Sequence, residues 1–130
     1  MTKKIMVVDD DNDIRFTIKH AFEFYEKDYE IFIAESGEHC FQLLNEGRIP
    51  DLILLDLMMP GMDGWTVFDK LKSKESPFNN IPIVFLTAKK DKDSVDVGQL
   101  FGEDYIEKPF DFENLYARIE KIINQDIKSD

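Results

Sequence analysis

Four short, mostly apolar runs in this chain each lead into a polar residue, and longer segments with helical periodicity separate them. The runs and the residues that follow them are 5–8 with Asp9 and Asp10, 52–55 with Asp56, 83–86 with Thr87, and 105–107 with Lys108. Short strands that alternate with helices predict a parallel sheet covered on both faces. The carboxyl ends of parallel strands lie at one edge of a sheet, where sites form. Three carboxylates, a hydroxyl and an ammonium are therefore expected to converge there.

The periodicity predicts five strands and five helices, an α/β architecture with a doubly wound parallel sheet. The expected strands are 5–8, 29–34, 52–55, 83–86 and 105–107. The expected helices are 13–26, a short helix capped by Ser36, and 63–72, 93–101 and 112–125. On the first helix, the residues expected to face the core are Ile14, Ile18, Ala21, Phe22 and Tyr25. Asp11 or Asp13 is expected to cap that helix.

Length and composition favour one domain over residues 1–130, with a core at about 3–125 and a short polar tail. The net charge of −11 argues against direct binding to nucleic acid, because phosphates would be repelled. No apolar run approaches the roughly 20 residues that span a bilayer, so no membrane contact is expected. The N-terminus lacks the pattern of a signal peptide, and the lone Cys40 cannot form an internal disulfide. These features favour a cytoplasmic protein.

Part of the negative charge is concentrated in one short segment that contains Asp9, Asp10, Asp11 and Asp13. Like charges this close resist folding together unless a cation or a lysine offsets them. Carboxylate oxygens are the ligands that Mg²⁺ prefers. The segment, together with Asp56, therefore predicts a divalent cation near the strand ends.

Four motifs in this order resemble the CheY-like receiver domain of two-component response regulators over essentially the whole chain. The matching segments are 6–11 (MVVDDD), 56–64 (DLMMPGMDG), 86–88 (LTA) and 108–110 (KPF). Each segment alone is a weak signal, and only their order and spacing are specific. The resemblance implies the flavodoxin-like (βα)5 fold, with five parallel strands in the order 2-1-3-4-5.

The resemblance further implies that Asp56 accepts a phosphoryl group from the phosphohistidine of a sensor histidine kinase or a phosphotransfer protein. Mg²⁺ (or Mn²⁺) would neutralise the charge of that group. Asp10 and Asp56 would bind the cation directly, the main-chain carbonyl of Met58 would add a ligand, and Asp9 would assist through water. The chain would not be an enzyme beyond catalysing its own phosphoryl transfer and dephosphorylation.

Thr87 and Lys108 would bind the phosphoryl oxygens, and the small Ala88 would leave room for them. The Lys108–Pro109 peptide matches a cis peptide of the family. Tyr105 matches an aromatic switch that, together with Thr87, alters the surface of the fourth helix, fifth strand and fifth helix. That surface would signal to an unknown downstream protein.

Two further expectations concern lifetime and assembly. Met58 and Lys89 flank the path that a hydrolytic water would take. Methionine cannot orient that water and lysine would occupy the space instead, so slow self-dephosphorylation is predicted. A homodimer linked to phosphorylation is a further hypothesis, with Arg118 and Asp104 as its only grounds in the sequence.

Two other classes of function are weighed against this one. An aspartate-nucleophile phosphohydrolase shares the Asp9-x-Asp11 pair, but Asp13 stands where its motif has threonine or valine. Such enzymes also need a larger substrate pocket than 130 residues easily supply. An interaction module that works without phosphorylation would usually have lost an acidic or lysine position, and none is lost here. A calcium loop is excluded, because Ile14 replaces its glycine and His20 its final glutamate.

Overall fold

A computed structural model of the chain describes residues 2–25, 27–88 and 104–128, with the backbone alone at 87, 88, 104 and 125–128. The strands are β1 (Lys3–Val8), β2 (Tyr29–Ala34), β3 (Leu52–Asp56), β4 (Ile83–Ala88) and β5 (Asp104–Lys108). The helices are α1 (Asn12–Phe24), α2 (Gly37–Asn45), α3 (Gly64–Lys72) and α5 (Phe112–Lys128). The helix predicted for 93–101 lies outside the described residues, which is why no α4 is assigned.

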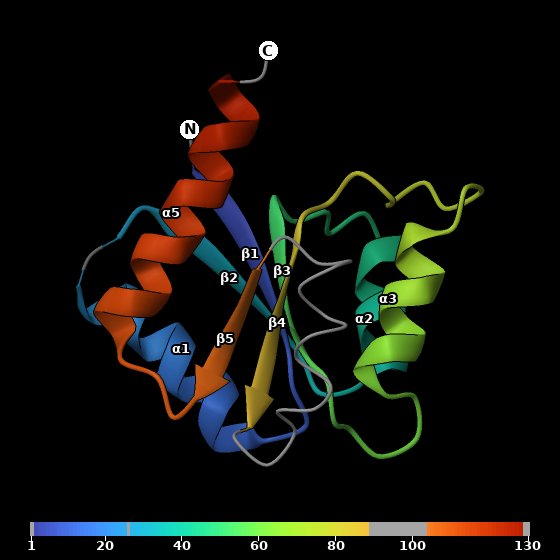
Figure 1. The fold of residues 1–130 in the computed structure, drawn as a ribbon, viewed down its shortest axis with the longest axis horizontal. Helices are drawn as coiled ribbons and strands as arrows, with labels where there is room; N and C mark the ends of the chain where they lie inside the picture. Colours follow the sequence, from blue (N-terminus) through green and yellow to red (C-terminus); the bar gives the residue numbers. More distant parts are fainter. Residues whose placement is uncertain (1, 26, 89–103, 129–130) are drawn as a thin grey trace.

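The five strands form one parallel sheet in the order β2-β1-β3-β4-β5, which confirms the predicted flavodoxin-like order. Helices α1 and α5 cover one face of the sheet, and α2 and α3 cover the other (Figure 1). The central position of β1 and β3 explains their continuous apolar runs, residues 5–8 and 52–55, since each strand buries side chains on both faces.

Alternate residues of the central strands supply two separate hydrophobic cores. In β1, Ile5 and Val7 pack toward α1 and α5, while Met6 and Val8 pack toward α2 and α3. This alternation follows from the period of two in a strand. Helix α5 contributes the buried side chains of Leu115, Ile119, Ile122 and Ile123.

Short polar residues begin each of the described helices. Asp11 accepts a hydrogen bond from the backbone N–H of Asp13 at 2.9 Å, and Ser36 accepts one from His39 at 3.0 Å. Asp63 caps α3 in the same manner. These caps satisfy N–H groups that have no partner within the helix. Asp11 is thus the residue that caps the first helix. Its carboxylate binds the Asp13 N–H and is not one of the three carboxylates, from Asp9, Asp10 and Asp56, that lie close together.

Some predictions about α1 and the last helix were wrong in detail. Tyr25 was expected in the core, but it is 54% exposed and stacks on Phe112 at a centroid distance of 5.1 Å. Arg15 is buried although no apolar position was expected there. Helix α5 continues to Lys128, so most of the segment predicted as a polar tail is helical. A helix propagates cheaply once it has formed, and hydropathy alone does not mark its end.

Within the ranges described above, no helix is long and apolar enough to cross a membrane.

Candidate functional site

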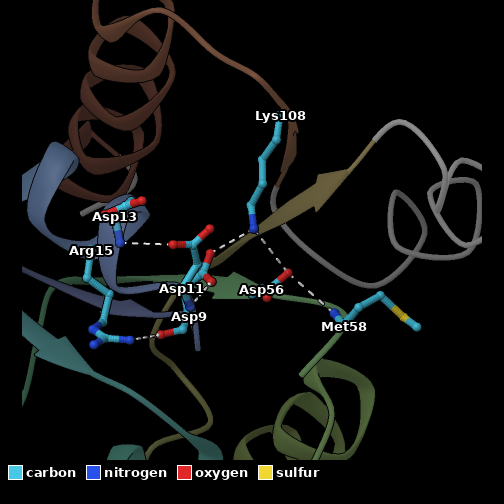
Figure 2. Close-up of polar contacts among 7 residues, drawn as sticks. All are labelled: Asp9, Asp11, Asp13, Arg15, Asp56, Met58 and Lys108. Atoms are coloured by element: carbon cyan, nitrogen blue, oxygen red, sulfur yellow. Dashed lines mark hydrogen bonds and ion pairs between the residues drawn. The ribbon is translucent and has the colours of Figure 1, made fainter. Parts of the chain in front are cut away.

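Three strand ends bring Asp9, Asp56 and Lys108 together at one edge of the sheet (Figure 2). Asp9 directly follows β1, Asp56 is the last residue of β3, and Lys108 is the last residue of β5. Their strands are not all adjacent, because β4 lies between β3 and β5. The long side chain of the lysine therefore reaches across the end of β4 to the two carboxylates.

The ammonium group of Lys108 pairs with two carboxylates. Its Nζ lies 2.8 Å from Asp9 Oδ2 and 3.5 Å from Asp56 Oδ1. Asp9 is fully buried and Asp56 is 4% exposed, so both charges lie away from bulk water. Removing charges from water is costly unless they are compensated, and Lys108 supplies compensation here.

The backbone around Asp9 fixes the position of its carboxylate. Its N–H donates to the carbonyl of Ala34 at 3.1 Å, and its Oδ1 accepts from the N–H of Asp11 at 2.9 Å. Oδ2 makes the ion pair with Lys108 but has no hydrogen-bond partner of good geometry among the described residues. A buried carboxylate oxygen with unused acceptor capacity is suited to a further cation or to an ordered water.

The loop after β3 holds Asp56 from the other side. The N–H of Met58 donates to Asp56 Oδ1 at 3.3 Å, and the N–H of Gly64 donates to the carbonyl of Leu57 at 2.9 Å. The Met58 side chain is 53% exposed and points away from the carboxylates (Figure 2). The loop therefore brings backbone groups to the carboxylates while the thioether stays outside.

Burial is the largest cause of a raised pKa at Asp56, and the neighbouring charge of Asp9 adds to it. Lys108 and the Met58 N–H lower the pKa in part, and the net result is a pKa of about 7. Burial also lowers the pKa of Lys108, but its pairing with Asp9 and Asp56 outweighs this, and the net shift is upward. The lysine therefore stays charged at neutral pH. One ammonium is not enough to stabilise both carboxylates fully in their charged forms.

The carboxylates of Asp9, Asp10 and Asp56 fit a divalent cation. One oxygen from each lies within 4.8 Å of the others, and Asp10 is the exposed member of the three. Hard oxygen ligands, a net negative charge and access from solvent are what Mg²⁺ requires, since it retains several waters. The three carboxylates therefore fit a divalent cation, and the individual ligand roles expected for Asp9, Asp10, Asp56 and the Met58 carbonyl remain predictions.

Three further residues predicted for the site, Thr87, Ala88 and Tyr105, lie on β4 and β5. The backbones of Thr87 and Ala88 extend β4 and lie opposite Glu107 and Lys108, which places both at the edge that carries the carboxylates. Tyr105 is half-buried and packs against the core on the α2 and α3 side, and its carbonyl accepts a hydrogen bond from Arg118. The roles of Thr87, Ala88 and Tyr105 remain predictions.

The Lys108–Pro109 peptide bond is cis, the isomer that the resemblance implies. Lys89 lies outside the described residues.

Arg15 lies beside the site, and the sequence pattern did not predict its place there. Its guanidinium Nη1 donates to the backbone carbonyl of Asp9 at 2.8 Å (Figure 2). The sequence feature that could have indicated this contact is a single basic residue, next to Ile14, in the first helical turn after an acidic segment. Periodicity alone assigned that position to solvent.

The raised pKa of Asp56 predicts an unusual pH dependence. The folded protein holds the Asp56 proton up to about pH 7, whereas the unfolded chain releases it near pH 3.8, its ordinary value. Between these values the folded state binds more protons, so this group's contribution to stability is lost as the pH rises from about 4 to 7. Asp56→Asn removes that loss, and we expect it to raise the free energy of unfolding at pH 8 by about 1–3 kcal/mol without Mg²⁺.

Urea denaturation of both proteins at pH 5 and pH 8 in EDTA measures this effect. The other carboxylates contribute equally to the pH dependence of both proteins, so their contribution cancels when the two free energies of unfolding are subtracted. An advantage for Asp56→Asn that is equal at both pH values would contradict the prediction.

Comparison with known proteins identifies the class to which this fold and site belong. The family model of the response regulator receiver domain matches residues 5–120, and the chain belongs to this family. Receiver domains are signalling modules of two-component systems, they bind Mg²⁺ in general, and they interact with a histidine kinase or a phosphotransfer protein.

Particular relatives include a regulator and a kinase. The chain is 36% identical over 120 residues to the uncharacterized transcriptional regulatory protein YrkP of Bacillus subtilis (strain 168), covering 92% of this chain and 48% of YrkP. It is 34% identical over 128 residues to the sensor histidine kinase TmoS of Ectopseudomonas mendocina, covering 98% of this chain and 13% of TmoS. The chain thus spans about half or less of the length of these relatives.

Solved structures of receiver domains have the same fold. The receiver domain of the Francisella response regulator 1452 has a TM-score of 0.82 and 29% identity, over 95% of this chain and 98% of that one. The receiver domain of AraT from Geobacillus stearothermophilus has a TM-score of 0.83 and 27% identity, over 99% and 98% of the two chains.

Proposed function

We propose that residues 1–130 act as a single phosphoacceptor module in which Asp56 receives a phosphoryl group. The observation that supports this most directly is the pairing of Lys108 with both Asp9 and Asp56 at the end of β3. This arrangement places a nucleophilic carboxylate, a fixed cation and a cluster of metal-binding oxygens at one point of the sheet edge. Phosphoryl transfer needs little else from a protein, since its catalysis consists mainly of positioning and charge neutralisation.

The proposed donor is a phosphohistidine on a sensor histidine kinase or a phosphotransfer protein. A carboxylate oxygen of Asp56 attacks phosphorus, the P–N bond breaks, and its electron pair returns to the imidazole, so that an acyl phosphate remains on Asp56. A bound Mg²⁺ would supply neutralisation of the phosphoryl charge. Lys108 provides a second positive charge for the phosphoryl oxygens, and the hydroxyl of Thr87 is proposed to donate to another.

Phosphorylation is proposed to change the surface built by the helix predicted at 93–101, β5 and α5. Thr87 would turn toward the phosphoryl group, and the ring of Tyr105 would follow it inward. The half-buried packing of Tyr105 is consistent with a ring that can occupy more than one position. The altered surface would bind an unidentified downstream protein. Arg118, proposed with Asp104 for a homodimer contact, donates to the Tyr105 carbonyl within this chain.

The placement of Asp11 weighs against a phosphohydrolase of the aspartate-nucleophile class. Such an enzyme uses the second aspartate of its Asp-x-Asp motif in catalysis, but Asp11 is exposed and caps α1 through its hydrogen bond with Asp13. The oxygens that cluster belong to Asp9, Asp10 and Asp56. An interaction module independent of phosphorylation has no need of this cluster.

Intact-mass spectrometry after incubation with acetyl phosphate and Mg²⁺ tests the proposal. We expect one added phosphoryl group on the wild type, and none on Asp56→Asn or in EDTA. Asp51→Asn is a matched control, because Asp51 precedes the same strand at its opposite end and should leave the adduct unchanged. An adduct that persists in Asp56→Asn would overturn the assignment of Asp56.

The decay of that adduct also tests the expected slow dephosphorylation. The exposed, non-polar side chain of Met58 beside the site is consistent with a long lifetime, because it cannot orient a hydrolytic water. Rapid release of free phosphate in place of an adduct would contradict this expectation while still supporting phosphoryl transfer.

A further inference from the structure

Arg15 is a buried cation beside the acidic cluster, and the proposed phosphoryl transfer assigns it no role. Its side chain belongs to the first turn of α1 and is 8% exposed. Nη1 donates to the Asp9 carbonyl at 2.8 Å, and Nη2 donates to the side-chain oxygen of Asn12 at 3.0 Å. A buried guanidinium is costly unless its donors are satisfied in a fixed geometry, so these contacts define one position for it.

The hydrogen bond from Arg15 acts on the peptide group that joins Asp9 to Asp10. A peptide group is planar, so a fixed Asp9 carbonyl also fixes the direction in which the Cα atom of Asp10 leaves it. Asp9 is additionally held through its N–H and its carboxylate. Asp10 is exposed and lacks the surrounding core that fixes Asp9, so its placement depends on the backbone that Arg15 holds.

The positive charge of Arg15 also favours keeping the Asp10 carboxylate close to its acidic neighbours. Asp9, Asp10, Asp11 and Asp13 lie in one short segment, and their mutual repulsion favours moving the exposed carboxylates apart. A guanidinium under this segment offsets part of that repulsion. Burial strengthens the effect, because charges away from water are screened less.

We infer that Arg15 is a positioning residue for the divalent cation: its guanidinium holds the Asp9–Asp10 peptide so that the Asp10 carboxylate stays beside those of Asp9 and Asp56. The inference rests on the proposed function and adds a residue to it. Arg15 itself is expected to touch neither the cation nor the phosphoryl group, because Nη1 is directed at the Asp9 carbonyl and Nη2 at Asn12.

Calorimetric titration of Mg²⁺ into the metal-free protein tests this role directly. Arg15→Met keeps the apolar stem and removes the donors, and we expect the Mg²⁺ dissociation constant to rise about tenfold or more. Asn12→Ala removes the partner of Nη2 at an exposed position and is expected to raise it about twofold to threefold. Lys19→Met removes a positive charge one turn further along α1 and serves as the control with unchanged affinity.

A second readout separates positioning from a general effect on folding. With acetyl phosphate, Arg15→Met should gain its phosphoryl group slowly at low Mg²⁺ and at nearly the wild-type rate when Mg²⁺ saturates the site. Arg15→Lys retains the charge and a donor, so its dissociation constant should lie between those of wild type and Arg15→Met. A residue that only stabilises α1 would not produce a defect that Mg²⁺ relieves.

The outcomes distinguish this inference from the proposed function. If the wild type binds Mg²⁺ and Arg15→Met binds it equally well, the role of Arg15 is wrong and the proposed site stands. If Arg15→Met does not fold, unchanged Mg²⁺ affinity in both Asn12→Ala and Arg15→Lys overturns the role in the same way. A wild type that does not bind Mg²⁺ would overturn the proposed metal site and this inference together.

Discussion

Replacing Lys108 with methionine is expected to abolish most phosphoryl transfer and to destabilise the metal-free protein. Methionine retains much of the apolar stem but not the ammonium that lies 2.8 Å from Asp9 and 3.5 Å from Asp56. Removing one partner of a buried ion pair leaves uncompensated charge and costs about 3–5 kcal/mol. Loss of a fixed charge from the phosphoryl site should slow the acetyl phosphate reaction by about 10²–10³-fold at saturating Mg²⁺.

Urea denaturation in EDTA and the rate of adduct formation measure the two effects separately. Part of the lost stability should return when Mg²⁺ is added, because a divalent cation replaces some of the missing charge. The double variant Lys108→Met/Asp56→Asn should also regain stability, since removing one carboxylate relieves the repulsion. Lys121→Met, an exposed lysine on α5, is the matched control. Wild-type stability and rate in Lys108→Met would contradict the proposed role.

Replacing Gly64 with alanine is expected to disrupt the loop that holds Asp56. A Cβ atom there would lie 2.3 Å from the carbonyl oxygen of Asp56 and 2.7 Å from the Cα atom of Leu57. Both neighbours are backbone atoms, so no side-chain rotation relieves the clash. Moving the loop would break the hydrogen bond from Gly64 N–H to the Leu57 carbonyl. We expect a loss of about 3 kcal/mol or more in the free energy of unfolding, together with much slower phosphorylation.

Gly47→Ala provides a matched control for this substitution. Gly47 has a φ of +91° and no heavy atom within 4 Å of an added Cβ, so alanine there meets backbone strain alone. We expect it to cost about 1 kcal/mol and to leave phosphorylation unchanged. Urea denaturation and acetyl phosphate labelling of the two variants distinguish the effect of a steric clash from the effect of losing the backbone freedom of glycine. Equal effects of both substitutions would show that close packing against Asp56 is not the cause.

Most of the fold could be predicted from the order of elements along the chain. The period of two in the apolar runs and the helical period between them indicate strands and helices directly, and parallel strands require the crossovers that α1, α2 and α3 provide. Residue-level patterns also predicted the cap at Ser36. They failed at Tyr25 and at the end of α5. The burial of a helical side chain and the length of a helix depend on which other elements pack against that helix, and the local pattern does not contain this information.

The sequence by itself determined which groups end the strands, and hence that Asp9, Asp56 and Lys108 would share one edge of the sheet. Only the tertiary structure decided how they interact there. The span of Lys108 across β4, the buried guanidinium of Arg15 behind Asp9 and the raised pKa of Asp56 depend on distances and burial between segments far apart in the chain. Local periodicity carries no information about such distances, because they arise when the sheet and its covering helices exclude water from the strand ends.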